Sequence, residues 1–437
     1  MKKARALSLL LAAVLCLSCI STALAADLPT IRFAHGWTAG DGMGEVGAKA
    51  IDDFAEAHKD EFILAQEVIV GDEMKSKIRI DIAGNNLPDA WMYWGSASDA
   101  GSFVKSGILL DAQEYLNLSQ NTCYEDYPEG SWDGFRIDGK VWGIPLQGYV
   151  GYWFCNRELF EKYNLEYPTT YEELLAVSEV FNANGIVPLA MGSKAGNPGH
   201  FFMSELYAQY PGAIEELHNM STTWQFDNEN IRQVCALIAE MKEKKVFPSD
   251  TIANGDWGPS FALYNDGRAA MVYSYTWMLG SMNPDIVAVT DIIPTPKMPG
   301  GTVDPATIVS RGCSYGLLIN KKSFEDPAKR DALVALADLI SSDAFVEDQL
   351  YLAAQVPGKE LDIDESRIAI PMMAEVLEFA KGKENMTNHW LNFPATKPWA
   401  DAQNFLDELF AGSLTPEEYI QKVQDSLDTV KAEEAEE

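Results

Sequence analysis

Strand-like and helix-like segments alternate along the start of the chain, and this pattern limits the possible folds more than any other feature of the sequence. Residues 30–37, 62–70 and 89–94 form short runs typical of strands. Between them, residues 43–55 and 74–82 carry apolar side chains at helical spacing. The alternation predicts an α/β layer with a mainly parallel sheet, in which ligand sites lie in the loops beyond the strand ends.

A second α/β unit is expected to begin between Gly143 and Gly151. Just before it, the pair Asp138-Gly139 stands between alternating residues and predicts a β-hairpin. After it, Thr170 with Glu173 three residues later forms a capping box that opens a helix. Without its first 26 residues the chain has about 410 residues, more than a single core usually holds, so two domains are expected.

The first 26 residues are expected to be an export signal. A cationic start is followed by an apolar run from Ala6 to about Leu17 and then by small residues. The run is short for a membrane-spanning helix, and the small residues favour cleavage after Ala25 or Ala26. A lipid anchor at Cys19 stays open as an alternative. Either route places the protein in the periplasm or on the outer face of the cell membrane.

The chain is strongly anionic. Its formal charge is -32, and removal of the leader takes away three cations and no acids, which gives -35. Such a charge repels nucleic acid and anionic membrane surfaces, so neither is expected as a partner. The acidic stretch 431–437 is expected to be a disordered tail.

Four cysteines follow the leader: Cys123, Cys155, Cys235 and Cys313. None forms a CxxC pair, so their spacing does not indicate a metal site. Two disulfides with three possible connectivities, or four free thiols, both fit an exported chain of this length. The sequence leaves this choice open.

No cofactor, metal or catalytic set is indicated. Gly42, Gly44 and Gly47 have the spacing of a dinucleotide-binding fingerprint, but several residues separate them from the preceding strand, where the fingerprint requires a tight turn. They are better interpreted as glycines at the start of a helix. The five histidines form no HExxH or HxxxH pair for zinc, and no GxSxG is present.

Aromatic side chains gather near the ends of predicted strands. In the run WMYW, strand alternation places Trp91 and Tyr93 on one face and Met92 and Trp94 on the other. Trp94 is the last residue before a Gly/Ser loop, where its ring can lean into a cleft. Flat rings with polar neighbours suit sugars, whose C–H faces stack on aromatic side chains.

A later segment repeats this arrangement. Residues 269–274 read as a strand with Met271 and Tyr273 on one face and Val272 on the other, and Trp277 lies just past its end. Trp277 is therefore expected to form one wall of a ligand cleft.

Four segments in order resemble the extracellular solute-binding proteins of family 1, the maltose-binding type that serves ABC importers. Residues 83–112 are similar to the family's "G..PD" strand and following helix, and residues 138–181 to its "dGk.ygiP" region. Residues 264–277 resemble its "GkaAM.....W" element, and residues 414–427 its closing helix. Trp153 and Cys155 depart from the family's "yyN" pattern, which suggests an altered pocket shape.

The resemblance implies a type II periplasmic-binding-protein, or Venus-flytrap, fold with two α/β lobes, a hinge and a ligand cleft between the lobes. The first lobe is expected at 27–145 plus 286–335, and the second at 146–285 plus 336–430. By position, the family's ligand contacts fall on Trp37, Asp41, Trp94, Tyr149, Trp277 and Trp399. Further candidate ligand contacts on the chain are Ser96, His200, Trp257 and Arg311.

The function implied is that of a monomeric, non-enzymatic binding component of an ABC importer, which delivers a sugar or oligosaccharide to a membrane permease. A cationic solute such as a polyamine is an alternative, because aromatic rings and acids together hold ammonium groups. A secreted carbohydrate-active enzyme is a third hypothesis, and it requires two carboxylates that face each other across the cleft. A surface adhesin or sensor subunit of the same fold is a fourth.

Overall fold

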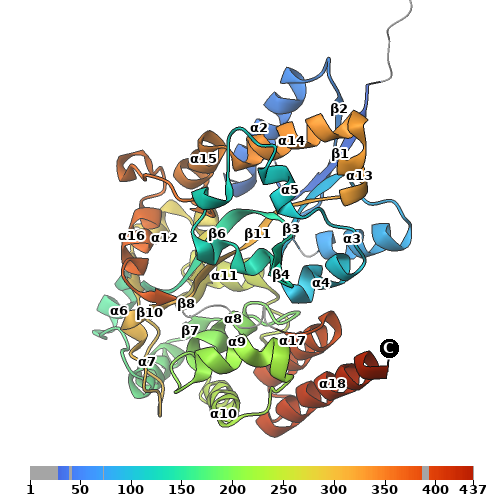
Figure 1. The fold of residues 1–437 in the computed structure, drawn as a ribbon. Coiled ribbons are helices and arrows are strands. Elements are labelled where there is room, and N and C mark those ends of the chain that lie inside the picture. Colours follow the sequence, from blue (N-terminus) through green and yellow to red (C-terminus); the bar gives the residue numbers. More distant parts are fainter. Residues whose placement is uncertain (1–27, 39–41, 72, 386–392, 437) are drawn as a thin grey trace, which may run out of the picture.

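The computed structural model describes residues 28–38, 42–71, 73–385 and 393–436, so the expected leader lies outside the described part. The chain forms two α/β lobes, one above the other in Figure 1, connected by the long strand β6 (Ile144–Asn156). The expected two-lobe α/β fold is confirmed. None of the helices in the described ranges has the length and apolar character needed to cross a membrane.

The first lobe is built on a sheet in the order β2-β1-β3-β11-β6. Strands β1, β2 and β3 are parallel, as expected, whereas β11 runs antiparallel to both β3 and β6. Its strands are β1 (Thr30–His35), β2 (Ile63–Val68), β3 (Ala90–Trp94) and β11 (Arg311–Ile319), with the small hairpin β4 (Arg136–Ile137) and β5 (Lys140–Val141). Its helices are α2 (Gly42–Ala57), α3 (Glu73–Ala83), α4 (Ala97–Lys105), α5 (Ala112–Leu116), α13 (Lys321–Glu325), α14 (Pro327–Ser341) and α15 (Asp343–Ala353).

Two apolar clusters fill the two faces of this sheet. One contains Phe33 and Met92 and packs under α2 and α14, and the other contains Trp91 and Tyr93 and packs under α3 and α4. The predicted alternation along β3 is therefore confirmed for residues 91–93. It is wrong for Trp94, which packs against the cluster of Trp91 and Tyr93 because the strand ends there.

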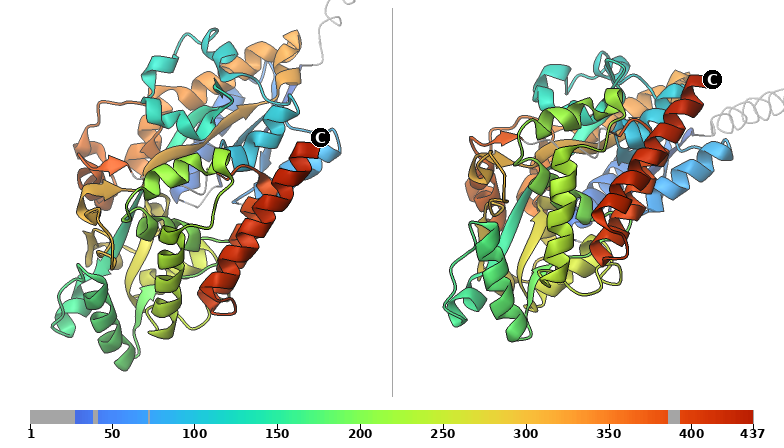
Figure 2. Two further views of the ribbon diagram at one scale, coloured as in Figure 1. Left: turned by 60° about the horizontal axis from the view of Figure 1, so that its bottom comes forward. Right: turned by 90° about the horizontal axis from the view of Figure 1, so that it is seen from below.

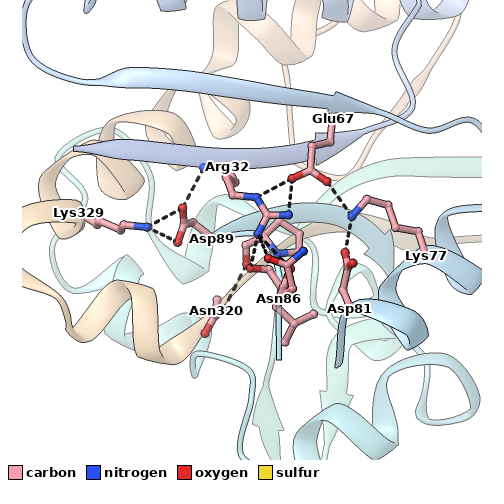
Figure 3. A network of polar contacts seen from close by, with 10 residues as sticks. Arg32, Glu67, Lys77, Asp81, Asn86, Asp89, Asn320 and Lys329 are labelled. Carbon is pink, nitrogen blue, oxygen red and sulfur yellow. Dashed lines mark hydrogen bonds and ion pairs between the residues drawn. The ribbon is translucent and has the colours of Figure 1, made fainter. Parts of the chain in front are cut away.

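A network of hydrogen bonds and ion pairs connects the strands of the first lobe to its helices (Figure 3). The Arg32 guanidinium donates to Glu67, whose carboxylate also pairs with Lys77 of α3 at 2.7 Å. Asp89, immediately before β3, accepts from the Arg32 backbone at 2.8 Å and from Lys329 of α14 at 2.8 Å. Burial opposes ionisation of Glu67, but the two cations lower its pKa overall. The network fixes β3 and thus the residues at its end.

The second lobe continues the same hydrogen-bonded sheet. The last residues of β6 pair with β8 and with β9, and β8 pairs with β7. Its strands are β7 (Val187–Ala190), β8 (Ala269–Tyr275) and β9 (Thr290–Ile293), and shorter strands are β10 (Ile308–Val309), β12 (Val356–Pro357) and β13 (Glu384–Asn385). Its helices are α6 (Arg157–Lys162), α7 (Tyr171–Ala183), α8 (Gly199–Tyr207), α9 (Ala213–Thr223), α10 (Glu229–Glu243), α11 (Trp257–Asn265), α12 (Pro284–Val287), α16 (Pro371–Ala380), α17 (Thr396–Ala411) and α18 (Pro416–Glu436).

Several local predictions are confirmed. Asp138 and Gly139 have φ of 52° and 74° at the β4–β5 hairpin, as a type I′ turn requires. Thr170 and Glu173 form the capping box of α7. In β8, Met271 and Tyr273 belong to one apolar cluster and Val272 to the other.

Two expectations about chain organisation differ from the structure. Strand β9 pairs with the end of β6, although the boundary at residue 286 assigned it to the first lobe. Helix α18 continues to Glu436 instead of fraying from residue 431, because the tail consists of strong helix formers. Figure 2 shows this helix running along one side of the molecule, and Lys105 of α4 pairs with Glu434 at 3.2 Å.

The four cysteines left open by the sequence are free thiols. Cys123 is exposed, and the other three are buried. Cys155 and Trp153, the two departures from the family pattern, are both fully buried in the apolar core of the second lobe. They therefore pack in the core of this lobe, and their effect on the shape of the pocket stays a prediction.

Candidate ligand-binding site

A cluster of aromatic rings in the second lobe surrounds Trp277. Strand β8 ends at Tyr275, and the short helix η4 (Thr276–Ser281) carries Trp277 just beyond it. The Trp277 ring stacks on Tyr275 with centroids 4.6 Å apart, and the Trp257 ring meets it edge-on at 5.2 Å. Phe201 and Tyr149 contact Trp277 at 5.8 and 5.9 Å. We call these five residues the aromatic wall.

The aromatic wall contains three residues predicted from the sequence and two that were missed. Tyr149, Trp257 and Trp277 come from distant parts of the chain and are brought together. Phe201 was missed because it lies in the apolar run of α8, and Tyr275 because it is the last residue of a strand that reads as core. Trp257 and Trp277 remain half-buried, whereas Tyr275 is fully buried behind them.

His200 and Trp399 extend the wall on one side. The His200 ring lies 4.2 Å from Phe201 and meets Trp399 of α17 edge-on at 5.1 Å. Burial lowers the pKa of His200 to about 3, so the imidazole is neutral, and its Nδ1 donates to the Gly196 carbonyl at 2.7 Å. Both predicted residues therefore belong to the same aromatic group as Trp277.

Trp94 marks the facing side in the first lobe. The Lys75 ammonium lies 4.6 Å from the centre of the Trp94 ring and pairs with Asp99 at 2.8 Å. The Ser96 hydroxyl caps α4, accepting from the Asp99 backbone and donating to the Asp99 carboxylate at 2.9 Å. Any contact of Trp94 or Ser96 with a ligand remains a prediction.

The two sides approach each other closely. Helix α17, which carries Trp399, packs against α4, and η4, which carries Trp277, packs against α2. The Lys75 charge also acts on His200 across the lobes and lowers its pKa further. The aromatic wall thus lies beside the contact between the lobes.

Trp37 is buried in the first lobe. Its ring packs on Phe345 at 5.5 Å and on helix α2 at Gly47, where an added Cβ would lie 2.4 Å from the indole. Gly47, the last glycine of the triplet Gly42, Gly44 and Gly47, is therefore needed for packing against this ring. Trp37 also lines a cavity of about 10 Å³, beside β6 and β12. Its neighbour Asp41 lies outside the described residues.

Arg311 begins β11 and is paired with Val150 of β6. The side chain is exposed and stands where both strands cross between the lobes. A role in ligand contact remains a prediction for this residue.

Elsewhere the described residues form a further hollow. A hollow of about 450 Å³ lies beside α5 and is lined by polar residues with Leu116 and Tyr124. The ranges that the structure describes hold no cluster of three or more His, Cys, Asp or Glu suited to a metal ion.

Comparison with protein families gives a match to the model described as bacterial extracellular solute-binding protein over residues 47–344. Among curated proteins, the chain is 24% identical over 183 residues to an uncharacterised ABC transporter extracellular-binding protein of Pyrococcus horikoshii, covering 41% of each. It is 22% identical over 344 residues to a probable sugar-binding periplasmic protein of Rhizobium meliloti, covering 75% of this chain and 76% of the other. For the first two curated relatives, the match spans only 41% and 59% of their length.

Solved structures share the fold over nearly the whole chain. One from work on xylan utilization by Caldanaerobius polysaccharolyticus has a TM-score of 0.77 and 25% identity, covering 91% of this chain and 99% of that one. A chitin oligosaccharide binding protein has a TM-score of 0.80 and 19% identity, covering 91% and 98%. The expected resemblance is thereby confirmed.

Proposed function

The chain belongs to the bacterial extracellular solute-binding proteins, and we propose that it binds a sugar or oligosaccharide between its lobes and delivers it to the permease of an ABC importer. The observation that carries the proposal is the aromatic wall beside the contact between the lobes. Half-buried indoles such as Trp257 and Trp277 offer flat apolar surface on which the C–H face of a sugar ring stacks. Several relatives are described as sugar-binding, which supports the same ligand class.

The mechanism we propose is a shift between open and closed arrangements of the lobes. A ligand that touches both lobes favours the closed arrangement, by no more than its difference in affinity for the two. Rotation would be absorbed where β6 and the segment around Ser310 pass from one lobe to the other. Trp94 on one side and Trp277 on the other would then approach the ligand from opposite lobes.

We also propose lobe boundaries that follow the strand pairing. Residues 290–293 go with the second lobe, because β9 pairs there. Residues 336–346 go with the first lobe, because Leu336, Ile340 and Phe345 pack in the cluster of Phe33. Residues 286–289 and 294–309 also go with the second lobe, which the chain leaves at Ser310, and the rest of α15 goes with the first lobe because α15 packs against α2.

A cationic ligand is less well supported. The Lys75 ammonium, paired with Asp99, already lies over the Trp94 ring, so a ligand ammonium on that face of Trp94 would have to displace an internal cation. A catalytic role is also less well supported, because Asp99 is engaged by Lys75 and Glu205 is buried behind Tyr273. We propose that the protein is exported, acts as a monomer and has no catalytic activity.

A thermal-shift screen tests the proposal. Because a ligand that binds only the folded state stabilises it, a matching sugar at 100 times its Kd adds about 2.7 kcal/mol to the unfolding free energy and raises Tm. The screen compares oligosaccharides derived from xylan, chitin and starch with polyamines. A rise with polyamines and with none of the sugars would reject the carbohydrate proposal. Recovery of the sugar intact after incubation separates binding from hydrolysis.

A further inference from the structure

A chain of four buried oxygen-bearing side chains runs through the interior of the second lobe. The Tyr273 hydroxyl lies 3.2 Å from Glu205 Oε1 and 2.6 Å from the Tyr275 hydroxyl. The Tyr275 hydroxyl lies 2.8 Å from Ser310 Oγ. Thr295 donates to the other carboxyl oxygen of Glu205 at 3.0 Å. The chain thus leads from helix α8 to Ser310.

Ser310 stands where the chain leaves the second lobe for the first. It lies between β10 and β11, and its carbonyl accepts from the Gly151 backbone at 2.8 Å. Gly151 is the residue of β6 at which pairing with β11 gives way to pairing with β8. An added Cβ at Gly151 would lie 2.8 Å from the Tyr275 ring, so β6 packs directly against Tyr275 at this crossing.

The direction of the hydrogen bonds along this chain depends on the charge of Glu205. Each hydroxyl carries one proton, so Tyr273 cannot donate to Glu205 and to Tyr275 at the same time. A protonated Glu205 donates to Tyr273, which donates to Tyr275, which donates to Ser310. A Glu205 carboxylate reverses all three bonds, because it can only accept.

Tyr275 connects these bonds to the aromatic wall. Its ring stacks on Trp277 with an interplanar angle of 5° and meets Tyr149 edge-on at 5.6 Å. A change in the bonds of its hydroxyl therefore acts on a ring that is held between the ligand side and the crossing strands.

We propose that Glu205 is a positioning residue that acts through Tyr273 and Tyr275 on the placement of Trp277, and that it acts on the crossing segment at Ser310 both through these hydroxyls and through the Ser310 backbone N–H that it accepts from. The inference rests on the proposed function only for the role of Trp277 as a ligand contact. The coupling itself is a property of the ligand-free protein.

The surroundings make the charge of Glu205 variable near neutral pH. Burial raises its pKa to about 7, against the opposing hydrogen bonds from Thr295, Tyr273 and the Ser310 backbone and the charge of Lys383. Lys383 faces Glu205, and its own pKa is lowered by burial, while Glu205 and Asp304 act in the opposite direction. His200 on the same helix stays neutral in this range.

Fluorine NMR of the ligand-free protein labelled with 5-fluorotryptophan tests the coupling. The Trp277 resonance is assigned by its loss in Trp277→Phe. We expect it to shift with pH in the wild type, with a midpoint near 7, and to lose most of this shift in Glu205→Gln and in Tyr273→Phe. Glu216→Gln is the matched control. The Glu216 carboxylate accepts a hydrogen bond at 2.5 Å from Tyr207, which lies on the same helix as Glu205, but Glu216 is not part of the oxygen chain. This control should titrate as the wild type does.

The proposal is overturned if Trp277 shows no titration in the wild type, or if the titration survives in Glu205→Gln or Tyr273→Phe. If Glu205→Gln does not fold, Tyr273→Phe decides the question, since it removes one oxygen of the chain and leaves the carboxyl in place. A failed sugar screen would reject the proposed function but would leave this result unaffected, because no ligand is used.

Discussion

The indole of Trp277 lies parallel to the phenol ring of Tyr275, with centroids 4.6 Å apart and an angle of 5° between the planes. Tyr275 is fully buried and hydrogen-bonded to Tyr273 and Ser310, whereas Trp277 is half-buried. The Tyr275 ring is therefore held firmly in the core, and the Trp277 ring leaves part of its surface exposed.

Trp277→Ala should weaken binding of the sugar found by the thermal-shift screen by roughly 1–3 kcal/mol, the value of one stacked and buried ring. The fold should stay intact, because the ring lies at the edge of the core. Isothermal titration gives the affinity, and near-ultraviolet circular dichroism checks the fold. Unchanged affinity, or a protein that no longer folds, would place Trp277 outside the ligand site.

Trp153→Ala, in contrast to Trp277→Ala, should lower the stability of the fold. Trp153 is fully buried in the core of the second lobe and contacts Phe202 at 5.8 Å. Removal of so large a core side chain costs roughly 3–5 kcal/mol of unfolding free energy. Urea unfolding measures the loss. A variant as stable as the wild type with weaker sugar binding would return Trp153 to the pocket, as the family pattern first suggested.

Local features of the fold were predictable because they depend on neighbouring residues. The hairpin at Asp138-Gly139 and the capping box of Thr170 and Glu173 are each encoded within a few positions. Strand alternation placed Met271 and Tyr273 together for the same reason.

The candidate site was only partly predictable, because it is made by contacts between distant segments. Trp277 could be found from its place after a strand, but Phe201 lies in a helix that reads as core. The position of β9 depends on its pairing with β6, which lies more than 130 residues earlier in the chain. The ion pair between Arg157 and Asp291 joins residues that are 134 positions apart. No local pattern records such a pairing.

Gly47→Ala should destabilise the first lobe, because the added methyl group would lie 2.4 Å from the Trp37 ring. Overpacking of this kind costs roughly 1–3 kcal/mol. Gly258→Ala is the matched control on helix α11, where the new methyl group meets no atom within 4 Å. The control should be neutral or more stable by up to about 1 kcal/mol. Thermal unfolding compares the stability of the two variants. Equal changes in Tm would show that the packing of the Trp37 ring does not require a glycine at position 47.

The stability of the protein should fall as the pH rises through about 7, owing to Glu205. Its pKa is about 7 in the folded protein and 4.5 without the fold, so the folded state binds the proton more tightly. The stabilisation is complete below pH 4.5 and is lost as pH passes the folded pKa. The unfolding free energy that is lost between these two pH limits amounts to roughly 3 kcal/mol. Urea unfolding at about pH 5 and about pH 8.5 should show this loss in the wild type and a smaller one in Glu205→Gln, which cannot ionise. The same pH dependence in both proteins would assign the effect to other groups.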